Sequence, residues 1–425
     1  MPLKAAKKRI QELESQQKYT EYQEKLGLEK ELTILRNDFY YQMTSLSSES
    51  VSLIDFLYKP LDTMSGDAYT ARKIDDFRTF YFIIDGMGKG LSASLTAMIM
   101  ASFTNHIIDK MIEHEYFDLY NLVFETLHYI QNILLEEEVL AIDYIVIDDE
   151  LTTIDYAKFA MPVSLMQNSK DEIIRLKSNN PPMSKYQNDF KISSHDISDI
   201  DKFLFYSDGI VENATIYENK TYADFIEEDF KDSFTRQELV DNIFSKITAQ
   251  EDDLTLAFIT KLKFNESTHI ATKTFGTSLD EVEEANKWYT ELLHNFCTNQ
   301  AVKHAAPIVF SELFMNAYEH GNLGIKANTK HKLIEDDIYF QTLSEKEQNC
   351  SKKITITIEK LQNKKSTSVV TIITDEGDGF NPHILSNIFR NSQTFNGRGV
   401  FVSRRNSMGI YYNTIGNTVL YINKT

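Results

Sequence analysis

An apolar strand ends at an acidic residue and a glycine-rich turn in the first quarter of the chain. Phe80–Ile84 reads as a buried strand, Asp85 closes it, and the run Gly-Met-Gly-Lys-Gly follows at 86–90. A helix of small and apolar residues is expected after Gly90. A strand, a turn and a helix in this order hold the Asp85 carboxylate at the rigid edge of a sheet, where other groups can meet it.

Three further aspartates stand near the ends of strands in the same way. Asp67 lies in Ser-Gly-Asp, Asp208 comes shortly after the strand Phe203–Tyr206, and Asp252 precedes the apolar stretch 254–259. Taken singly, each reads more readily as a turn residue or a helix cap. Carboxylates that a rigid sheet holds against one another are the oxygen ligands that hard divalent cations such as Mg²⁺ or Mn²⁺ require. Two such ions can activate a water for attack on a phosphoryl group. The full ordered set differs from its single members because it resembles a known family of phosphatases.

The ordered set resembles the metal-dependent PPM phosphatases, and within them the bacterial subgroup typified by the sporulation stage II E phosphatase, from roughly Ser52 to Lys261. The resemblance implies two Mn²⁺ or Mg²⁺ ions and substrates that are phosphoserine or phosphothreonine proteins. It implies that Asp67 and Asp85 are catalytic and bridge both metals, with Gly86 offering its backbone carbonyl. It further implies that Asp208 and Asp252 bind the second metal.

One segment departs from that subgroup. Where the subgroup commonly carries an Ala-Gly-His run, this chain reads Ala-Lys-Phe-Ala-Met-Pro at 157–162. Because these are not metal-ligand positions, the departure affects the expected local geometry and leaves the phosphatase prediction in place.

A second group of polar residues lies on an expected helix near position 312. Glu312, Asn316 and His320 are spaced by four residues, which places them on one helical face. An asparagine in the middle of a helix is mildly unfavourable, so its position beside Glu and His invites a polar role. A solvated helix face that ends at a Gly cap explains the helix equally well when it is taken alone.

Glycine-rich segments downstream favour a nucleotide site. An apolar strand at 369–373 runs into Asp375, Gly377 and Gly379, and a second box holds Gly397, Arg398 and Gly399. Such glycines allow the backbone to approach phosphates, and an Asp can accept a hydrogen bond from an adenine amino group. With the helix, these motifs resemble the GHKL nucleotide-binding fold and its anti-sigma-factor serine kinases, over about Lys273 to Lys424.

The resemblance assigns a role to each of these residues. Asn316 would hold Mg²⁺, and Asp375 would accept a hydrogen bond from the adenine of ATP. The residues that would line the nucleotide and its lid are Gly377, Gly379, Gly397, Arg398 and Gly399. Glu312 matches the position of the general base that acts on a substrate serine. It could instead orient a water or Mg²⁺, which would give ATP hydrolysis or nucleotide sensing. The stretch 322–353 is longer than in simple anti-sigma kinases.

A chain of 425 residues is expected to hold two domains and a helical appendage. The expected class is α+β: a helix at 1–48, a PPM-type β-sandwich flanked by helices at 49–264, and a GHKL-type α/β sandwich at 273–425. In the first segment Leu28, Leu32, Leu35 and Phe39 form a short seam. The seam fits either a dimerising coiled coil, and hence a homodimer, or a helix packed on its own domain.

Composition narrows the environment and the partners. The formal charge of -19 argues against direct nucleic-acid binding, which needs clustered Lys and Arg. The two cysteines, Cys297 and Cys350, have no metal-ligand spacing and suggest no disulfide framework. No apolar run approaches the roughly 18 residues that span a membrane. A cytoplasmic protein without a membrane anchor is expected.

Together the two resemblances predict a bacterial signalling regulator. Its expected partner is a small phosphorylated protein, a STAS-domain antagonist of an anti-sigma factor, and a sigma factor is a further candidate partner. One alternative is a phosphatase with a nucleotide-sensing domain, and another is a scaffold that binds without turnover. A histidine kinase fits less well, because it would require a phosphoacceptor His in a dimerisation helix just upstream of the ATP domain. The N-terminal helix contains no His, and His114-Glu115 lies inside the phosphatase region.

Overall fold

The computed structural model describes residues 26, 34–38, 43–47, 50–61, 64–87, 90–362, 367–381, 403 and 406–425. By its internal contacts the chain divides into two compact units. The first comprises 1–38, 57–227 and 243–257, and the second comprises 39–56, 228–242 and 258–425.

An antiparallel sheet in the first unit carries two of the predicted site aspartates. Its strand order is β10-β6-β5-β4-β3, and the short β9 (Met183–Ser184) pairs with β5. The strands are β3 (Asp67–Lys73), β4 (Arg78–Gly86), β5 (Val139–Asp148), β6 (Thr153–Phe159) and β10 (Ser193–Asp196). All of β4 from Thr79 to Ile84 is buried, as expected for a strand covered on both faces.

A second sheet has the strand order β1-β2-β12-β11-β7-β8. Its strands are β1 (Met43–Ser47), β2 (Ser50–Lys59), β12 (Leu254–Lys263), β11 (Ile200–Tyr206), β7 (Ser164–Asn168) and β8 (Ile173–Leu176). Tyr81 of β4 and Phe205 of β11 meet with ring centroids 6.0 Å apart, so the two sheets face each other across a shared core.

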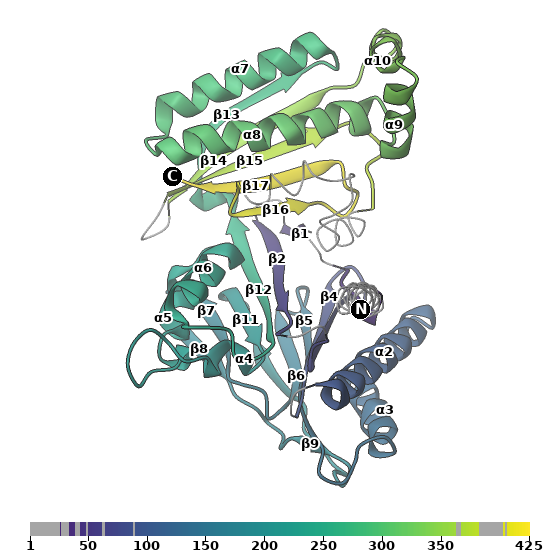
Figure 1. Ribbon diagram of the computed structural model, residues 1–425, viewed down its shortest axis with the longest axis vertical. Helices are drawn as coiled ribbons and strands as arrows, with labels where there is room; N and C mark the ends of the chain where they lie inside the picture. Colours follow the sequence, from purple (N-terminus) through teal and green to yellow (C-terminus); the bar gives the residue numbers. More distant parts are fainter. Residues whose placement is uncertain are drawn as a thin grey trace, which may run out of the picture. The chain divides into compact units, whose positions relative to one another are not determined.

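Two helices cover the outer side of the first sheet (Figure 1). They are α2 (Leu91–Glu113) and α3 (Leu119–Gln131), and Asp118 caps α3 by accepting the N–H of Asn121 at 2.7 Å. Among the described residues, α2 alone is long and apolar enough to cross a membrane, yet 56% of its apolar window is buried inside the domain. Its buried face of Ala93, Ala97 and Ala101 contacts the sheet, as in a core helix.

Short helices complete this part of the chain. They are α4 (Gly209–Glu212), the 3-10 turn η1 (Tyr222–Asp224), α5 (Ile226–Asp232) and α6 (Arg236–Lys246). The 3-10 turn η2 (Phe264–Glu266) follows β12.

The predicted helix at 1–48 is corrected by the structure, because residues 43–47 form strand β1, which pairs with β2, and Asn37 makes a β-bridge to Ala71. Residues 36–38 are fixed to the first unit by polar contacts. Asp38 accepts the guanidinium of Arg72 at 3.2 Å, and Arg36 pairs with Asp109 at 2.5 Å. Leu35, the one seam residue in the described part of the chain, is buried at 3% exposure. Leu28, Leu32 and Phe39 lie outside the described residues, and the coiled coil stays a prediction.

A third antiparallel sheet lies in the second unit, with the order β13-β14-β15-β17-β16. Its strands are β13 (Thr268–Phe275), β14 (Ile354–Gln362), β15 (Thr367–Asp375), β16 (Gly409–Tyr412) and β17 (Thr418–Lys424). Helices α7 (Leu279–Phe296) and α8 (Gln300–Asn316) cover one face (Figure 1). Tyr289 stacks on Phe310 at 4.1 Å between them, and its hydroxyl lies 3.0 Å from Thr371 of the sheet.

After α8 the chain forms the π-helical turn η3 (Ala317–Asn322) and two helices, α9 (Ala327–Glu335) and α10 (Tyr339–Glu347). These two helices account for the long predicted segment 322–353 and stand at one end of the sheet (Figure 1).

The predicted start of the second domain at 273 is corrected by the structure. Residues 268–275 form β13, which pairs with β14, so this sheet begins five residues before the predicted start at 273. The hydrogen bonds of β14 outweigh the polar character of residues such as Thr268 and Thr272, which lie on an exposed edge strand.

Candidate functional site

Asp67 and Asp85 lie directly opposite each other on neighbouring antiparallel strands, β3 and β4. Asp67 is 2% exposed, and Asp85 is partly buried. Carboxylates paired across a ladder have Cβ atoms roughly 5 Å apart, and their like charges repel. Such a pair is costly unless it is protonated or shares a cation, so the register itself indicates a site for positive charge.

The second sheet supplies a contact that orients the Asp67 carboxylate. Ser207, directly after β11, donates its hydroxyl to Asp67 Oδ2 at 2.7 Å. In the first sheet Gly86, which follows Asp85, donates its N–H at 3.1 Å to the carbonyl of Gly66, which precedes Asp67. Asp67 is therefore held from both sheets.

Asp208 follows Ser207 and precedes the single turn of α4. Its side chain makes no capping hydrogen bond to that turn, although it occupies the N-cap position. The cap interpretation of this aspartate is therefore not supported.

The loop that carries Asp252 approaches α4 very closely. A Cβ added to Gly209 would lie 2.0 Å from the carbonyl oxygen of Asp253 and 3.2 Å from Cβ of Asp252. Only glycine fits at 209 without moving this loop, and its absence of a side chain brings Asp252 beside Asp208.

The pKa values report how closely the four predicted metal ligands interact. Burial, followed by the charges of Asp67, Asp208 and Asp252, raises the pKa of Asp85 to about 10. Burial also raises the pKa of Asp67 well above its usual range, with the charges of Asp253 and Asp208 adding to the effect. All four aspartates therefore share one electrostatic site, although they come from three separate parts of the sequence.

Oxygen ligands of this kind suit Mg²⁺ or Mn²⁺. In the described residues, no three Asp, Glu, His or Cys side chains converge closely enough to enclose an ion by themselves. A cation that replaced the protons of Asp67 and Asp85 would relieve the repulsion that raises their pKa values. The type of ligand, its burial and its charge thus fit the predicted ions.

Asp253 is a site residue that the sequence interpretation missed. Its Oδ1 accepts the N–H of Leu61 and its Oδ2 accepts the N–H of Gly66, both at 2.6 Å. These bonds fix the loop that leads into Asp67. The signal was the acidic triplet 251–253, of which only the middle residue was assigned a role.

Lys158, in the segment 157–162 that departs from the sporulation stage II E subgroup, forms a fully buried ion pair with Asp143 on the neighbouring strand. Lys158 Nζ on β6 lies 2.9 and 2.7 Å from the two carboxylate oxygens of Asp143 on β5, and donates to Ser164 of β7 at 2.9 Å. Both charged side chains have no exposed surface. Burial lowers the pKa of Lys158 and raises that of Asp143, and each partner opposes the shift of the other. This lysine therefore ties the two sheets together.

In the second unit, Asp375 ends β15 in a tight setting formed by glycines. A Cβ on Gly321 would lie 2.4 Å from Cγ of Asp375, and one on Gly377 would lie 2.2 Å from the carbonyl of Gly321. Gly377 donates its N–H to Asp375 Oδ1 at 2.8 Å. Burial raises the pKa of Asp375 to about 6 despite that bond and the charge of Lys352. Gly379 has φ +74°, which favours glycine.

Glu312 and Asn316 are half-buried on α8, and the charges of Glu312 and Asp375 both act on the buried Tyr412. The expectation that His320 continues their face is wrong. The π turn after Asn316 changes the helical register, which leaves His320 exposed and buries Glu319 at 2% exposure. Gly397, Arg398 and Gly399 lie outside the described residues.

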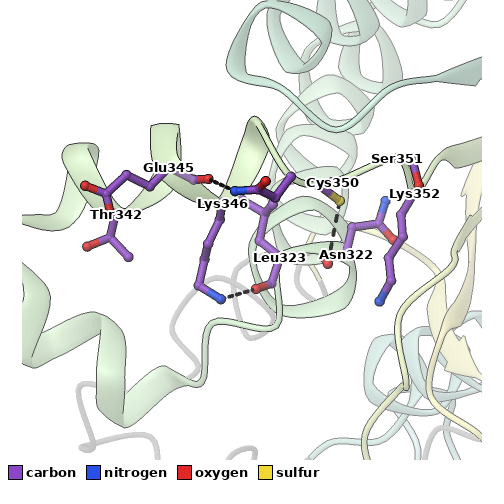
Figure 2. Close-up of a pocket in the computed structure, with 9 residues that line it drawn as sticks. Asn322, Leu323, Thr342, Glu345, Lys346, Cys350, Ser351 and Lys352 are labelled. Carbon is purple, nitrogen blue, oxygen red and sulfur yellow. Dashed lines mark hydrogen bonds between the residues drawn. The ribbon is translucent and has the colours of Figure 1, made fainter.

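A pocket of about 480 Å³ lies beside the π turn (Figure 2). Its nine lining residues are Asn322, Leu323, Thr342, Glu345, Lys346, Asn349, Cys350, Ser351 and Lys352. Lys346 donates to the carbonyl of Leu323 at 2.9 Å across it. None of the predicted nucleotide residues lines this pocket, although Asn322 accepts the N–H of Glu376, next to Asp375, at 2.9 Å.

A known family matches a region in the first two thirds of the chain. Residues 75–261 match the family described as Stage II sporulation protein E (SpoIIE). The phosphoserine phosphatase RsbP of Bacillus subtilis (strain 168) is 27% identical over 201 residues, which are 44% of this chain and 47% of RsbP. The chain thus spans about half the length of this curated relative. Residues 75–261 are thus similar to a phosphatase domain of the SpoIIE type.

Solved structures give weaker similarities. The RsbU and RsbW domains of a Mycobacterium tuberculosis protein are 14% identical with a TM-score of 0.42, covering 88% of this chain and 94% of that one. The PP2C phosphatase domain of SpoIIE from Bacillus subtilis, with a fragment of its regulatory domain, is 19% identical with a TM-score of 0.41, covering 50% and 64%.

Proposed function

We propose that this chain hydrolyses phosphoserine or phosphothreonine on a partner protein, by two-metal chemistry at Asp67, Asp85, Asp208 and Asp252. The observation that carries the proposal is the opposed, buried pair of Asp67 and Asp85, whose pKa values are raised by burial and by the neighbouring aspartates. The match of residues 75–261 to the SpoIIE family supports the same reaction.

Each residue of the site then has a definable task. Asp67, Asp85, Asp208 and Asp252, together with the Gly86 carbonyl, would hold two Mn²⁺ or Mg²⁺ ions. Bound ions would supply an activated water and neutralise the phosphoryl charge. Ser207 holds the Asp67 carboxylate through its hydrogen bond at 2.7 Å.

The partner that we propose is a small STAS-domain antagonist of an anti-sigma factor. Similarity to RsbP, a phosphoserine phosphatase, favours phosphoserine as the target. Cytoplasmic location and a homodimer through the N-terminal residues stay predictions.

For the second unit we propose binding of ATP with Mg²⁺. Asp375, cradled by Gly321 and Gly377, would accept the adenine amino group, and Asn316 would hold the ion. Gly379, Gly397, Arg398 and Gly399 would line the phosphates and the lid. Glu312 would then serve as the base for phosphorylation of the same partner, or the domain would only sense nucleotide.

Phosphate release from a purified partner tests the phosphatase proposal. A serine-phosphorylated STAS protein is incubated with the chain and Mn²⁺, and phosphoserine is followed by mass spectrometry. Its loss is expected with the wild type and not with Asp85→Asn. Unchanged phosphoserine across a set of such proteins, together with no hydrolysis of p-nitrophenyl phosphate, would reject the proposal. Adding ATP to the dephosphorylated partner tests the kinase: regained phosphoserine supports it, and none supports sensing.

Calorimetry tests the nucleotide site separately. ATP with Mg²⁺ is expected to bind the wild type, and Asn316→Ala is expected to weaken binding at least about tenfold by removing an ion ligand. Asn349→Ala, in the neighbouring pocket, is the matched control and should bind normally. Equal affinity of the wild type and Asn316→Ala would count against the site.

A further inference from the structure

Exposed apolar side chains are concentrated beside the metal-site aspartates. Met87, Leu91 and Leu95 are 57%, 67% and 49% exposed, and Leu135 is 65% exposed. Large apolar side chains in water are unremarkable when they are scattered, but a contiguous group next to a catalytic centre indicates a contact surface.

Hydrogen bonds bring together the chain segments that carry these four residues. Glu138 accepts the hydroxyl of Ser92 and the N–H of Leu135, both at 3.0 Å. Met87 donates its N–H to the carbonyl of Val139 at 3.4 Å. The segment after α3 is thereby held against the start of α2. We call Met87, Leu91, Leu95 and Leu135 the apolar rim.

The apolar rim adjoins the metal site. A Cβ on Gly86 would lie 3.1 Å from the carbonyl of Ala93, so Gly86 packs on the first turn of α2. Leu91 and Leu95 are each two residues from Ala93, about 3 Å along the helix axis. The start of α2, which carries Leu91 and Leu95, therefore lies beside the glycine that follows Asp85.

Further along α2 the outward face is polar. Its exposed positions beyond Leu95 are Ser102, His106, Asp109, Lys110 and Glu113. The apolar exposure is thus confined to the end of the helix that adjoins the metal site, which a general surplus of surface leucine does not explain.

Charge specifies the chemistry of the occupant. Glu136 and Glu137 are exposed beside Leu135, and the site itself is built from aspartates. A partner that fits would offer apolar side chains near its phosphoserine and Lys or Arg at their edge, which oppose these carboxylates.

We propose that the apolar rim is the docking surface for the folded phosphoprotein substrate, and that it selects a phosphoserine flanked by an apolar face with basic residues at its margin. This inference rests on the proposed phosphatase function and adds to it how the substrate is chosen. We therefore expect a small phosphoester to reach the aspartates without touching the rim and a folded substrate to contact it.

The test compares two substrates in one set of variants. Leu91→Gln with Leu95→Gln keeps good helix formers on α2 while removing the apolar surface. Leu151→Gln is the matched control: Leu151 is also 67% exposed but lies in the β5–β6 turn, at the opposite end of the sheet from Asp85. Substrates are p-nitrophenyl phosphate and the serine-phosphorylated STAS protein that the wild type dephosphorylates.

The double variant is expected to lose at least tenfold in kcat/KM on the phosphoprotein, mainly through KM, and to stay within twofold on p-nitrophenyl phosphate. The control should match the wild type on both. Unchanged kcat/KM on the phosphoprotein would overturn the proposal, and so would an equal loss on both substrates. A dimer that the double variant converts to monomer would instead make the rim an interface between copies. Absence of wild-type turnover of p-nitrophenyl phosphate would refute the phosphatase itself.

Discussion

At the scale of single residues, the unusual feature is a pair of aspartates placed opposite each other where water is scarce. Burial and the charges of Asp67, Asp208 and Asp252 raise the pKa of Asp85 to about 10, above about 4 in an unfolded chain. The folded, metal-free protein therefore holds a proton that the unfolded chain releases. The site favours a bound proton or a cation over free carboxylates.

This arrangement predicts a pH-dependent cost. Because the pKa of Asp85 is higher in the folded state, its contribution to stability is complete below about pH 4 and is lost as pH rises toward about 10. Asp85→Asn removes this titration. In EDTA, the unfolding free energy of the wild type relative to the variant should fall with pH, by up to about 1.4 kcal/mol per pH unit. Urea unfolding between about pH 5 and 8 measures it, and a difference that does not change with pH would contradict the account.

Lys158 offers a second test at this scale. With Asp143 and Lys158 both without exposed surface, Lys158→Met leaves a buried carboxylate unpaired and should cost about 3–5 kcal/mol of unfolding free energy. Removing both charges, in Asp143→Leu with Lys158→Met, should recover most of that loss. Chemical denaturation distinguishes the cases. A single variant as stable as the wild type would show that the pair contributes nothing.

At the scale of elements, strands were predictable because buried runs such as Phe80–Ile84 leave little choice of structure. The π turn at 317–322 was not, because one added residue per turn leaves no mark in a helical periodicity. His320 was therefore placed wrongly and Glu319 overlooked. Glu319 is buried and pairs with Lys330 at 2.5 Å and with Tyr339, both from the segment 327–347. Such long-range partners are invisible in local sequence.

Contact between α4 and the loop at 252–253 gives a prediction for elements. In Gly209→Ala the new Cβ would lie 2.0 Å from the Asp253 carbonyl, so the loop must move and carry Asp252 away from Asp208. Affinity for Mn²⁺ should fall at least about tenfold, as for the loss of a ligand. Gly324→Ala is the control, because Gly324 has φ +64° but no atom within 4 Å of an added Cβ. It should cost about 1 kcal/mol of stability and leave Mn²⁺ affinity unchanged. Calorimetry measures both the Mn²⁺ affinity and the stability. Equal Mn²⁺ affinities of the wild type and Gly209→Ala would disprove the role of this contact.

At the scale of the whole molecule, the chain combines a region that matches the SpoIIE family with a second unit built on a five-stranded sheet and two long helices. The sequence led to the four aspartates through the resemblance of their ordered set to the PPM phosphatases, and their role as metal ligands stays a prediction. The sequence could not predict Asp253 or Ser207, whose roles depend on loops and sheets that meet only in the fold. Of the predicted nucleotide residues, the structure describes Asp375, Gly377, Asn316 and Glu312, whereas residues 397–399 lie outside its described part.

The central claim is that Asp67, Asp85, Asp208 and Asp252 form one metal-dependent hydrolytic centre. Turnover of p-nitrophenyl phosphate as a function of Mn²⁺ tests it most directly, in the wild type and in the four single Asp→Asn variants, with the thermal midpoint in EDTA as a check on folding. The account predicts saturable Mn²⁺ dependence in the wild type. It predicts a loss of at least about a hundredfold in Asp67→Asn and Asp85→Asn, both still folded. Undiminished turnover in a folded Asp85→Asn variant would contradict it.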